Sequence, residues 1–162
     1  MYSVSPISKD LKSYYFETKI ERKGDGDISI GLSRSTTSNT RPGNSDASIG
    51  LHIYDGSIAR DFDGNKKRDV DVKNWLKIED NDTIGCMIRR VYNGDELFVF
   101  CYFTKNGERL DPVIHIEDND YYPIISVYTE DASFIPNLGD STFLYDNKGN
   151  FSLLEYFIII II

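Results

Sequence analysis

Residues 84–104 read IGCMIRRVYNGDELFVFCYFT, and this stretch decides the fold class. Apolar side chains recur along both halves, and Asn93-Gly94-Asp95 between them has the composition of a tight turn. The second half, Leu97 to Thr104, begins with consecutive apolar residues, as in a strand that is buried on both faces. The stretch therefore predicts an antiparallel hairpin whose second strand lies at the centre of a sandwich.

In the rest of the chain, short alternating segments are likewise separated by turn residues, and almost no segment has helical periodicity. Residues 14–21 predict a half-buried strand with Phe16 and Ile20 on one face, and the turn 23–27 returns the chain into 28–33 as a hairpin. Further strands are expected at 48–53, 123–128, 134–138 and 142–145, turns at 55–56, 63–65 and 106–107, and loops over 35–46 and up to Lys73. We predict an all-β fold, a two-sheet antiparallel β-sandwich of about nine or ten short strands.

The composition fits one domain and disfavours two classes of partner. The chain has 162 residues, of which 40% are hydrophobic, enough for a core without disulfides or metals. Its net charge of −8 repels phosphate backbones and anionic lipid heads, so neither nucleic acid nor a membrane is an expected partner. The one short basic run, 66–68, is interpreted as a solvated turn.

The cysteines and the chain ends bear on the compartment. Cys86 and Cys101 lie in apolar alternating runs, which indicates buried, reduced thiols. Residues 1–6 contain no basic region followed by an apolar stretch, so we expect no secretory signal and a cytoplasmic location. The apolar run 158–162 is far shorter than the roughly 20 residues of a membrane span. It fits a last strand, the edge of a longer chain or an aggregation-prone segment equally well.

Patterns for catalysis and metal binding are not supported. His52 and His115 are the only histidines, and each is interpreted as having a structural or surface role rather than a catalytic one. Residues 61–65 open with the spacing of a calcium loop, but Lys66 stands where that loop needs glycine, so a solvated turn is the better interpretation. Paired carboxylates for glycoside hydrolysis and a phosphate-binding loop are not identified. We predict that the chain is not an enzyme and uses no cofactor or metal.

Several short motifs occur in one order. They are Tyr14-Tyr15-Phe16-Glu17, Ile30-Gly31-Leu32-Ser33, Arg41-Pro42-Gly43, Ser48-Ile49-Gly50-Leu51-His52, Asp55-Gly56, Asp82-Thr83-Ile84-Gly85-Cys86, Tyr102-Phe103-Thr104-Lys105-Asn106-Gly107, Tyr122-Pro123, Pro136-Asn137-Leu138-Gly139 and Phe143. This set resembles the SPRY domain, most closely the Ran-binding-protein-M-type branch. The resemblance divides the chain into an N-terminal extension (1–13), the SPRY domain (14–146) and a C-terminal tail (147–162). Two departures stand out: Asn81 replaces a usual glycine, which a left-handed turn tolerates, and Tyr54 intrudes before Asp55-Gly56.

The resemblance implies a concanavalin-like jelly roll of the SPRY type without an active site. It implies a non-catalytic protein–protein interaction module, monomeric, that binds a short peptide or a protein face through a loop-lined surface. Such modules recruit substrates or scaffolds, often in ubiquitin-ligase-type assemblies. By position, the partner-binding residues are Arg34, Arg41, Arg60, Phe62, Tyr128 and Glu130. Arg and Tyr are residue types that concentrate binding energy; the competing interpretation makes the aromatics core or rim residues and the arginines solvated.

Two other functions stay open at this point. Lectins share the sandwich architecture, and exposed aromatics stack on sugar rings, so a lectin-like carbohydrate binder is the main alternative. A non-catalytic structural domain inside a longer chain is the other, because a fold alone does not define a function.

Overall fold

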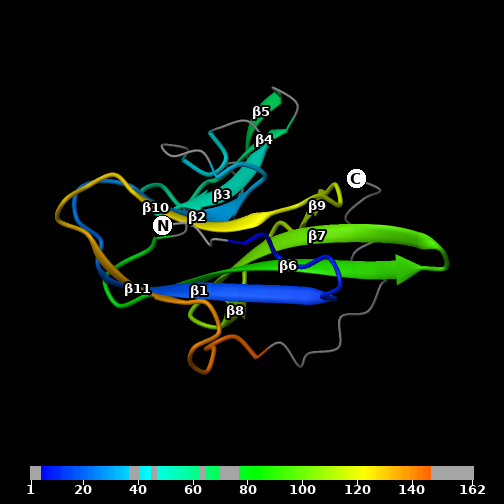
Figure 1. The fold of residues 1–162 in the computed structure, drawn as a ribbon. Helices are drawn as coiled ribbons and strands as arrows, with labels where there is room; N and C mark the ends of the chain where they lie inside the picture. Colours follow the sequence, from blue (N-terminus) through cyan, green and yellow to red (C-terminus); the bar gives the residue numbers. More distant parts are fainter. Residues whose placement is uncertain (1–4, 37–40, 45–46, 63–64, 70–76, 147–162) are drawn as a thin grey trace.

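The computed structural model describes residues 5–36, 41–44, 47–62, 65–69 and 77–146, which form two antiparallel sheets packed face to face (Figure 1). Within these residues the first sheet has six strands: β1 (Ser13–Arg22), β6 (Thr83–Asn93), β7 (Glu96–Lys105), β8 (Glu108–Arg109), β9 (Ile114–Ile116) and β11 (Ser133–Asn137). The second has five: β2 (Ile28–Ser33), β3 (Ser48–His52), β4 (Ile58–Phe62), β5 (Asn65–Asp69) and β10 (Tyr122–Val127). The strand orders are β11-β1-β6-β7-β8, with β9 beside β7, and β10-β2-β3-β4-β5. The predicted all-β sandwich is therefore confirmed.

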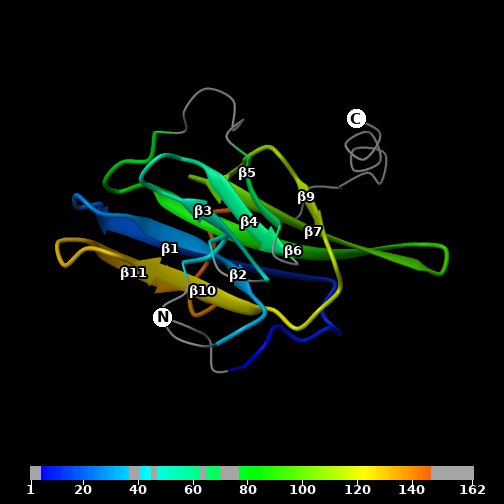
Figure 2. The same cartoon turned by 90° about the horizontal axis from the view of Figure 1, so that it is seen from above.

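The hydrophobic core fills the space between the two sheets. Alternate residues of β2, Ile28, Ile30 and Leu32, point inward and are fully buried. Phe16 and Ile20 of β1 meet them from the other sheet, on the predicted face. Each such side chain contributes about 1.5–3 kcal/mol when it is buried. Figure 2 shows the five-stranded sheet lying over the six-stranded one, as this shared core requires.

The hairpin that the sequence predicts most clearly is confirmed as β6 and β7. Their pairing runs from Ile84 opposite Lys105 to Asn93 opposite Glu96. Gly94 takes the positive φ of 61° that the tight turn requires. The hairpin forms the centre of the six-stranded sheet, and its tip extends beyond the five-stranded sheet (Figure 1).

The two cysteines are buried in the core, as predicted. Cys86 and Cys101 are fully buried free thiols whose Sγ atoms lie 3.9 Å apart. Burial, together with the neighbouring thiol, raises the pKa of Cys86 well above its ordinary value. Cys86 therefore stays protonated, and both residues pack as small hydrophobic side chains.

The predicted hairpin between the first two strands is wrong. Gly24 does take a positive φ, but β1 pairs with β6 and β11, whereas β2 pairs with β3 and β10. Residues 23–27 thus cross from one sheet to the other instead of closing a hairpin. An Asp-Gly turn reverses the chain locally without deciding which sheet the next strand joins.

Two further expectations need correction. The charged stretch that was expected to be a loop contains β5, which pairs with β4 from Phe62 opposite Asn65 to Ile58 opposite Asp69. Conversely, residues 142–145 form no strand. The turn at 63–64 and residues 70–73 of the expected loop lie outside the described residues. In the described part of the chain, we find no helix with the length and hydropathy of a membrane span.

Residues 138–146 form a strap across the outer face of the six-stranded sheet, drawn in orange in Figure 1. The Phe143 ring meets Tyr15 edge-on at 5.0 Å, and the Tyr145 ring lies 5.2 Å from Tyr15. The backbone N–H of Leu144 donates to both carboxylate oxygens of Glu17 at 3.0 and 3.2 Å. The strap thereby buries a second apolar cluster outside the main core.

The segment before β1 also packs on the domain. Ile7 is buried, and its N–H donates to the Tyr121 carbonyl at 2.8 Å. The Arg90 N–H donates to the carbonyl of Lys12 at 2.7 Å. Residues 5–12 therefore contact the sandwich directly, while the predicted boundaries at 13/14 and 146/147 stay predictions and the tail 147–162 lies outside the described residues.

Alkaline pH is expected to destabilise the fold through two buried tyrosines. Burial raises the pKa of Tyr15 and of Tyr121 above the ordinary value near 10. Above about pH 10 the unfolded chain loses phenol protons that the folded chain keeps, so stability falls as pH rises. The slope should be roughly 1.4 kcal/mol per pH unit for each such tyrosine. Urea unfolding between pH 9 and 11.5 measures it, Tyr15→Phe should make it shallower, and an unchanged slope in that variant would contradict the assignment.

Candidate functional site

The outer face of the five-stranded sheet carries small residues at its centre. Gly31, Gly50 and Ala59 lie opposite one another on β2, β3 and β4. A Cβ on Gly50 would lie only 2.5 Å from the Pro42 Cβ, and one on Gly43 only 2.7 Å from the Ala59 Cβ. Segment 41–44 therefore lies flat on this face, and only glycine at position 50 leaves room for its backbone.

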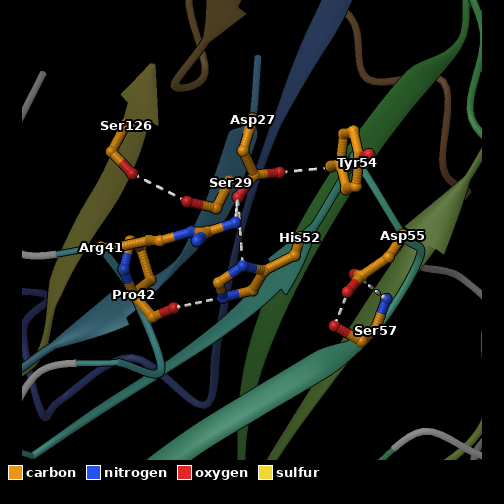
Figure 3. A network of polar contacts seen from close by, with 9 residues as sticks. All are labelled: Asp27, Ser29, Arg41, Pro42, His52, Tyr54, Asp55, Ser57 and Ser126. Atoms are coloured by element: carbon orange, nitrogen blue, oxygen red, sulfur yellow. Dashed lines mark hydrogen bonds and ion pairs between the residues drawn. The ribbon is translucent and has the colours of Figure 1, made fainter. Parts of the chain in front are cut away.

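One buried carboxylate anchors that segment to the sheet. Asp27, just before β2, is only 9% exposed. Its Oδ2 pairs with the Arg41 guanidinium and lies 3.1 Å from His52 Nδ1, while its Oδ1 accepts the Tyr54 N–H at 3.0 Å. Figure 3 shows Arg41, from the covering segment, and His52 and Tyr54, from the end of β3 and the turn after it, converging on Asp27.

Two exposed tyrosines flank the same residue. The N–H of Tyr128, after β10, donates to the Asp27 carbonyl at 2.9 Å, so the backbones of Tyr54 and Tyr128 both hydrogen-bond to Asp27. Their side chains are 65% and 50% exposed. The Arg41 guanidinium lies 5.8 Å from the Tyr128 ring centroid, within cation–π range. We call Asp27, Arg41, His52, Tyr54 and Tyr128 the Asp27 cluster.

A second cluster lies at the other end of β2, around Arg34. The Arg34 guanidinium lies 5.3 Å from the Phe62 ring centroid and 5.7 Å from that of Tyr121. It donates to Glu117 at 2.9 Å and to the Tyr121 hydroxyl at 3.5 Å. Burial acts against the charge, but Tyr121 and Glu117 together raise the pKa of Arg34. Arg34 thus closes this end of the core with its charge compensated.

The six predicted binding residues consequently do not form one surface. Arg34 and Phe62 lie together at one end of β2, while Arg41 and Tyr128 lie together at the other, about 20 Å away for a six-residue strand. Glu130 is exposed two residues beyond Tyr128. Arg60 is half-buried in β4, opposite Ile49. Their roles in binding stay predictions, and the geometry favours the Asp27 end because its aromatic side chains are exposed.

The sequence interpretation missed three members of the Asp27 cluster as site residues. From the sequence, Asp27 is interpreted as the last residue of a turn and His52 as a structural residue. The complete burial of His52 is consistent with a structural role. Tyr54 did carry a signal, because it is the extra residue before Asp55-Gly56. In the described part of the chain, three or more His, Cys, Asp or Glu side chains do not gather in a way that could hold a metal ion.

Comparison with known proteins identifies the family. The SPRY domain family model matches residues 13–140. Ran-binding protein 10 of Danio rerio is 31% identical over 144 residues, which are 87% of this chain and 22% of that protein. Ran-binding protein 9 of Homo sapiens is 31% identical over 87% of this chain and 18% of its own length. The Ran-binding protein M homolog of Arabidopsis thaliana is 29% identical over 85% of this chain and 27% of its own length. The chain thus spans about a quarter or less of these relatives.

Solved structures agree on the fold. A human SPRY domain superposes with a TM-score of 0.66 at 21% identity, covering 88% of this chain and 85% of that one. The SPRY domain of human HERC1 superposes with a TM-score of 0.60 at 15% identity, covering 87% and 82%. The two-sheet architecture and the family match show that the chain belongs to the SPRY domain family, and its similarity to these relatives is consistent with the Ran-binding-protein-M-type branch.

Proposed function

We propose that this SPRY domain is a non-catalytic interaction module that binds a peptide or protein segment at the Asp27 cluster. One observation carries the proposal: the backbone N–H groups of two exposed tyrosines both hydrogen-bond to the buried Asp27, that of Tyr54 to its carboxylate and that of Tyr128 to its carbonyl. Tyrosines contribute large contact area with little loss of entropy, and a fixed backbone lowers the entropic cost of binding. The predicted residues Arg41, Tyr128 and Glu130 lie at this end of the sheet.

The charge of the surface favours a partner segment with basic side chains. Glu130 and Asp131 are exposed beside Tyr128, and the whole chain carries −8. The Arg41 charge is already paired with Asp27, so it adds little net positive potential. A Lys or Arg of the partner would meet carboxylates and tyrosine rings together.

The finer context rests on the family resemblance. We propose that the bound segment belongs to a protein substrate or scaffold of a ubiquitin-ligase-type assembly, that the domain acts as a monomer in the cytoplasm, and that nucleic acid and membranes are not its partners. Neither histidine supports catalysis. In His52, Nδ1 contacts Asp27 and Nε2 contacts the Pro42 carbonyl oxygen. His115 lies against Phe98 and Phe100 on the other sheet.

The binding prediction is tested with Tyr128→Ala and Tyr54→Ala. Captured proteins from a cell lysate are identified by mass spectrometry, and overlapping synthetic peptides from them are titrated against the full chain. We expect each variant to weaken peptide binding about tenfold or more, because exposed tyrosine hot spots typically carry 2 kcal/mol or more. Tyr92→Ala is the matched control, since Tyr92 is 62% exposed on the distant β6–β7 hairpin.

Three results would speak against the proposal. Peptide binding that survives Tyr54→Ala/Tyr128→Ala would place the interface elsewhere. Equal losses in Tyr92→Ala would show a nonspecific aromatic effect. Release of captured glycoproteins by free sugar would favour the lectin-like alternative instead.

A further inference from the structure

His52 is buried with an acceptor facing each of its ring nitrogens. Its side chain is 0% exposed. Nε2 lies 2.8 Å from the Pro42 carbonyl oxygen, and Nδ1 lies 3.1 Å from Asp27 Oδ2. A carbonyl oxygen can only accept, so Nε2 carries a hydrogen. The carboxylate of Asp27 is paired with Arg41 and therefore ionised, so Nδ1 must also donate to it.

The geometry therefore favours the doubly protonated ring. A neutral imidazole has one N–H and would leave a lone pair facing either the carboxylate or the carbonyl. The imidazolium satisfies both contacts and links segment 41–44, through Pro42, to the residue that begins β2. The ring thus holds together two parts of the proposed binding surface.

The charges around His52 come from every element packed beside it. Asp27 precedes β2, and Arg41 enters from the covering segment and shares the same carboxylate. Asp61, on the outer face of β4, lies opposite Ser48, four residues along β3 from His52, and Asp55, in the turn after β3, bonds to Ser57. Tyr128 follows β10 beneath Arg41. Asp27 contacts the ring directly, and its carboxylate faces both the Arg41 guanidinium and the His52 imidazolium.

We propose that His52 is a positioning residue for the binding surface, acting as a pH-sensitive latch on segment 41–44. While the ring is doubly protonated, Pro42, Arg41 and Asp27 are fixed, and Arg41 stays over Tyr128. When pH rises and Nδ1 loses its proton, the ring can no longer donate to Asp27 and the segment loosens. The latch itself depends only on the fold; its effect on partner affinity rests on the proposed function.

The test follows the ring and the segment separately, in the full chain and without a partner. Nitrogen NMR shifts report the protonation of His52 Nδ1 and Nε2 between roughly pH 5 and 9, with His115→Gln assigning the two rings. The Gly43 amide, which donates to Ser48 Oγ at 2.8 Å, reports the segment through hydrogen exchange. The reference is the Leu110 amide, which donates to the Phe103 carbonyl in the other sheet.

We expect His52 to be doubly protonated at pH 7. As it loses a proton, Gly43 protection should fall about tenfold, as for one lost hydrogen bond, while Leu110 protection stays constant. A ring that is neutral at pH 7, or Gly43 protection that stays flat through the ring titration, would overturn the latch.

Asp27→Asn separates charge from packing. The amide of this variant can donate to a neutral Nδ1, so Nε2 keeps its proton for Pro42 at every pH. The variant should therefore show a neutral ring at pH 7 and Gly43 protection without a pH step. A pH step of wild-type size in Asp27→Asn would also refute the latch. If the latch titrates as expected but peptide affinity is the same in Tyr128→Ala as in the wild type, only the proposed function is refuted.

Discussion

Gly31→Ala is expected to destabilise the domain by about 3 kcal/mol, near the upper end of overpacking effects. A Cβ at this position would lie 2.7 Å from the Gly50 Cα and 2.9 Å from the Ile49 carbonyl carbon. Both atoms belong to the backbone of β3, so no side-chain rotation can relieve the contact. The β2–β3 pairing at the centre of the five-stranded sheet would have to open. Urea unfolding followed by circular dichroism measures the loss.

Gly94→Ala is the matched control for this substitution. Gly94 lies at the turn of the β6–β7 hairpin, and a Cβ there would meet no atom within 4 Å. Its φ of 61° still favours glycine, so the variant should lose only about 1 kcal/mol through backbone strain. If the two variants lose equal stability, close backbone approach is not what requires glycine at position 31.

Local patterns predicted the strands well because alternation and turn chemistry act over a few residues. The expected strand 28–33 coincides with β2, and the turn at Gly94-Asp95 sets the β6–β7 register. Asn81, expected to tolerate a left-handed conformation, has a φ of 70°. These features depend on the residues themselves and their immediate neighbours.

The pairing of strands over long distances could not be predicted in the same way. Phe16 of β1 lies opposite Cys86 of β6, and no local signal connects them. The strand β5 was missed because an edge strand can be entirely polar when only backbone atoms pair. Residues 142–145 contain residue types that strands favour, Thr, Phe and Tyr, but Phe143 packs on Tyr15 and the Leu144 N–H bonds to Glu17, so the segment forms a strap.

In the candidate site, too, individual residues could be predicted but their contacts over long sequence distances could not. The family resemblance pointed to Arg41 and Tyr128, and the structure brings their side chains together. It could not reveal that Asp27 pairs with the Arg41 side chain and accepts the Tyr128 N–H, nor that it contacts His52, 25 residues further along the chain. Nor could it show that Arg34 and Phe62 contact each other at the opposite end of β2. A loop position indicates proximity to a surface, whereas burial and charge pairing emerge only from the assembled sheets.

Glu17→Ala is expected to destabilise the domain by about 2–3 kcal/mol, because it removes a buried acceptor that several donors share. Glu17 is only 5% exposed. Its carboxylate accepts the Tyr15 hydroxyl at 2.9 Å, the Leu144 N–H at 3.0 Å and the Asn137 amide at 3.4 Å. Without it, the Leu144 N–H loses its partner under the strap, and Phe143 is no longer held against Tyr15.

Glu21→Ala on the same strand is the control, since Glu21 is exposed and its truncation should change stability by less than about 0.5 kcal/mol. Urea unfolding compares the two variants, and hydrogen exchange at the Leu144 amide reports the strap directly. We expect faster Leu144 exchange in Glu17→Ala only. If both variants unfold alike and Leu144 remains protected, packing of Phe143 and Tyr145 holds the strap without the carboxylate.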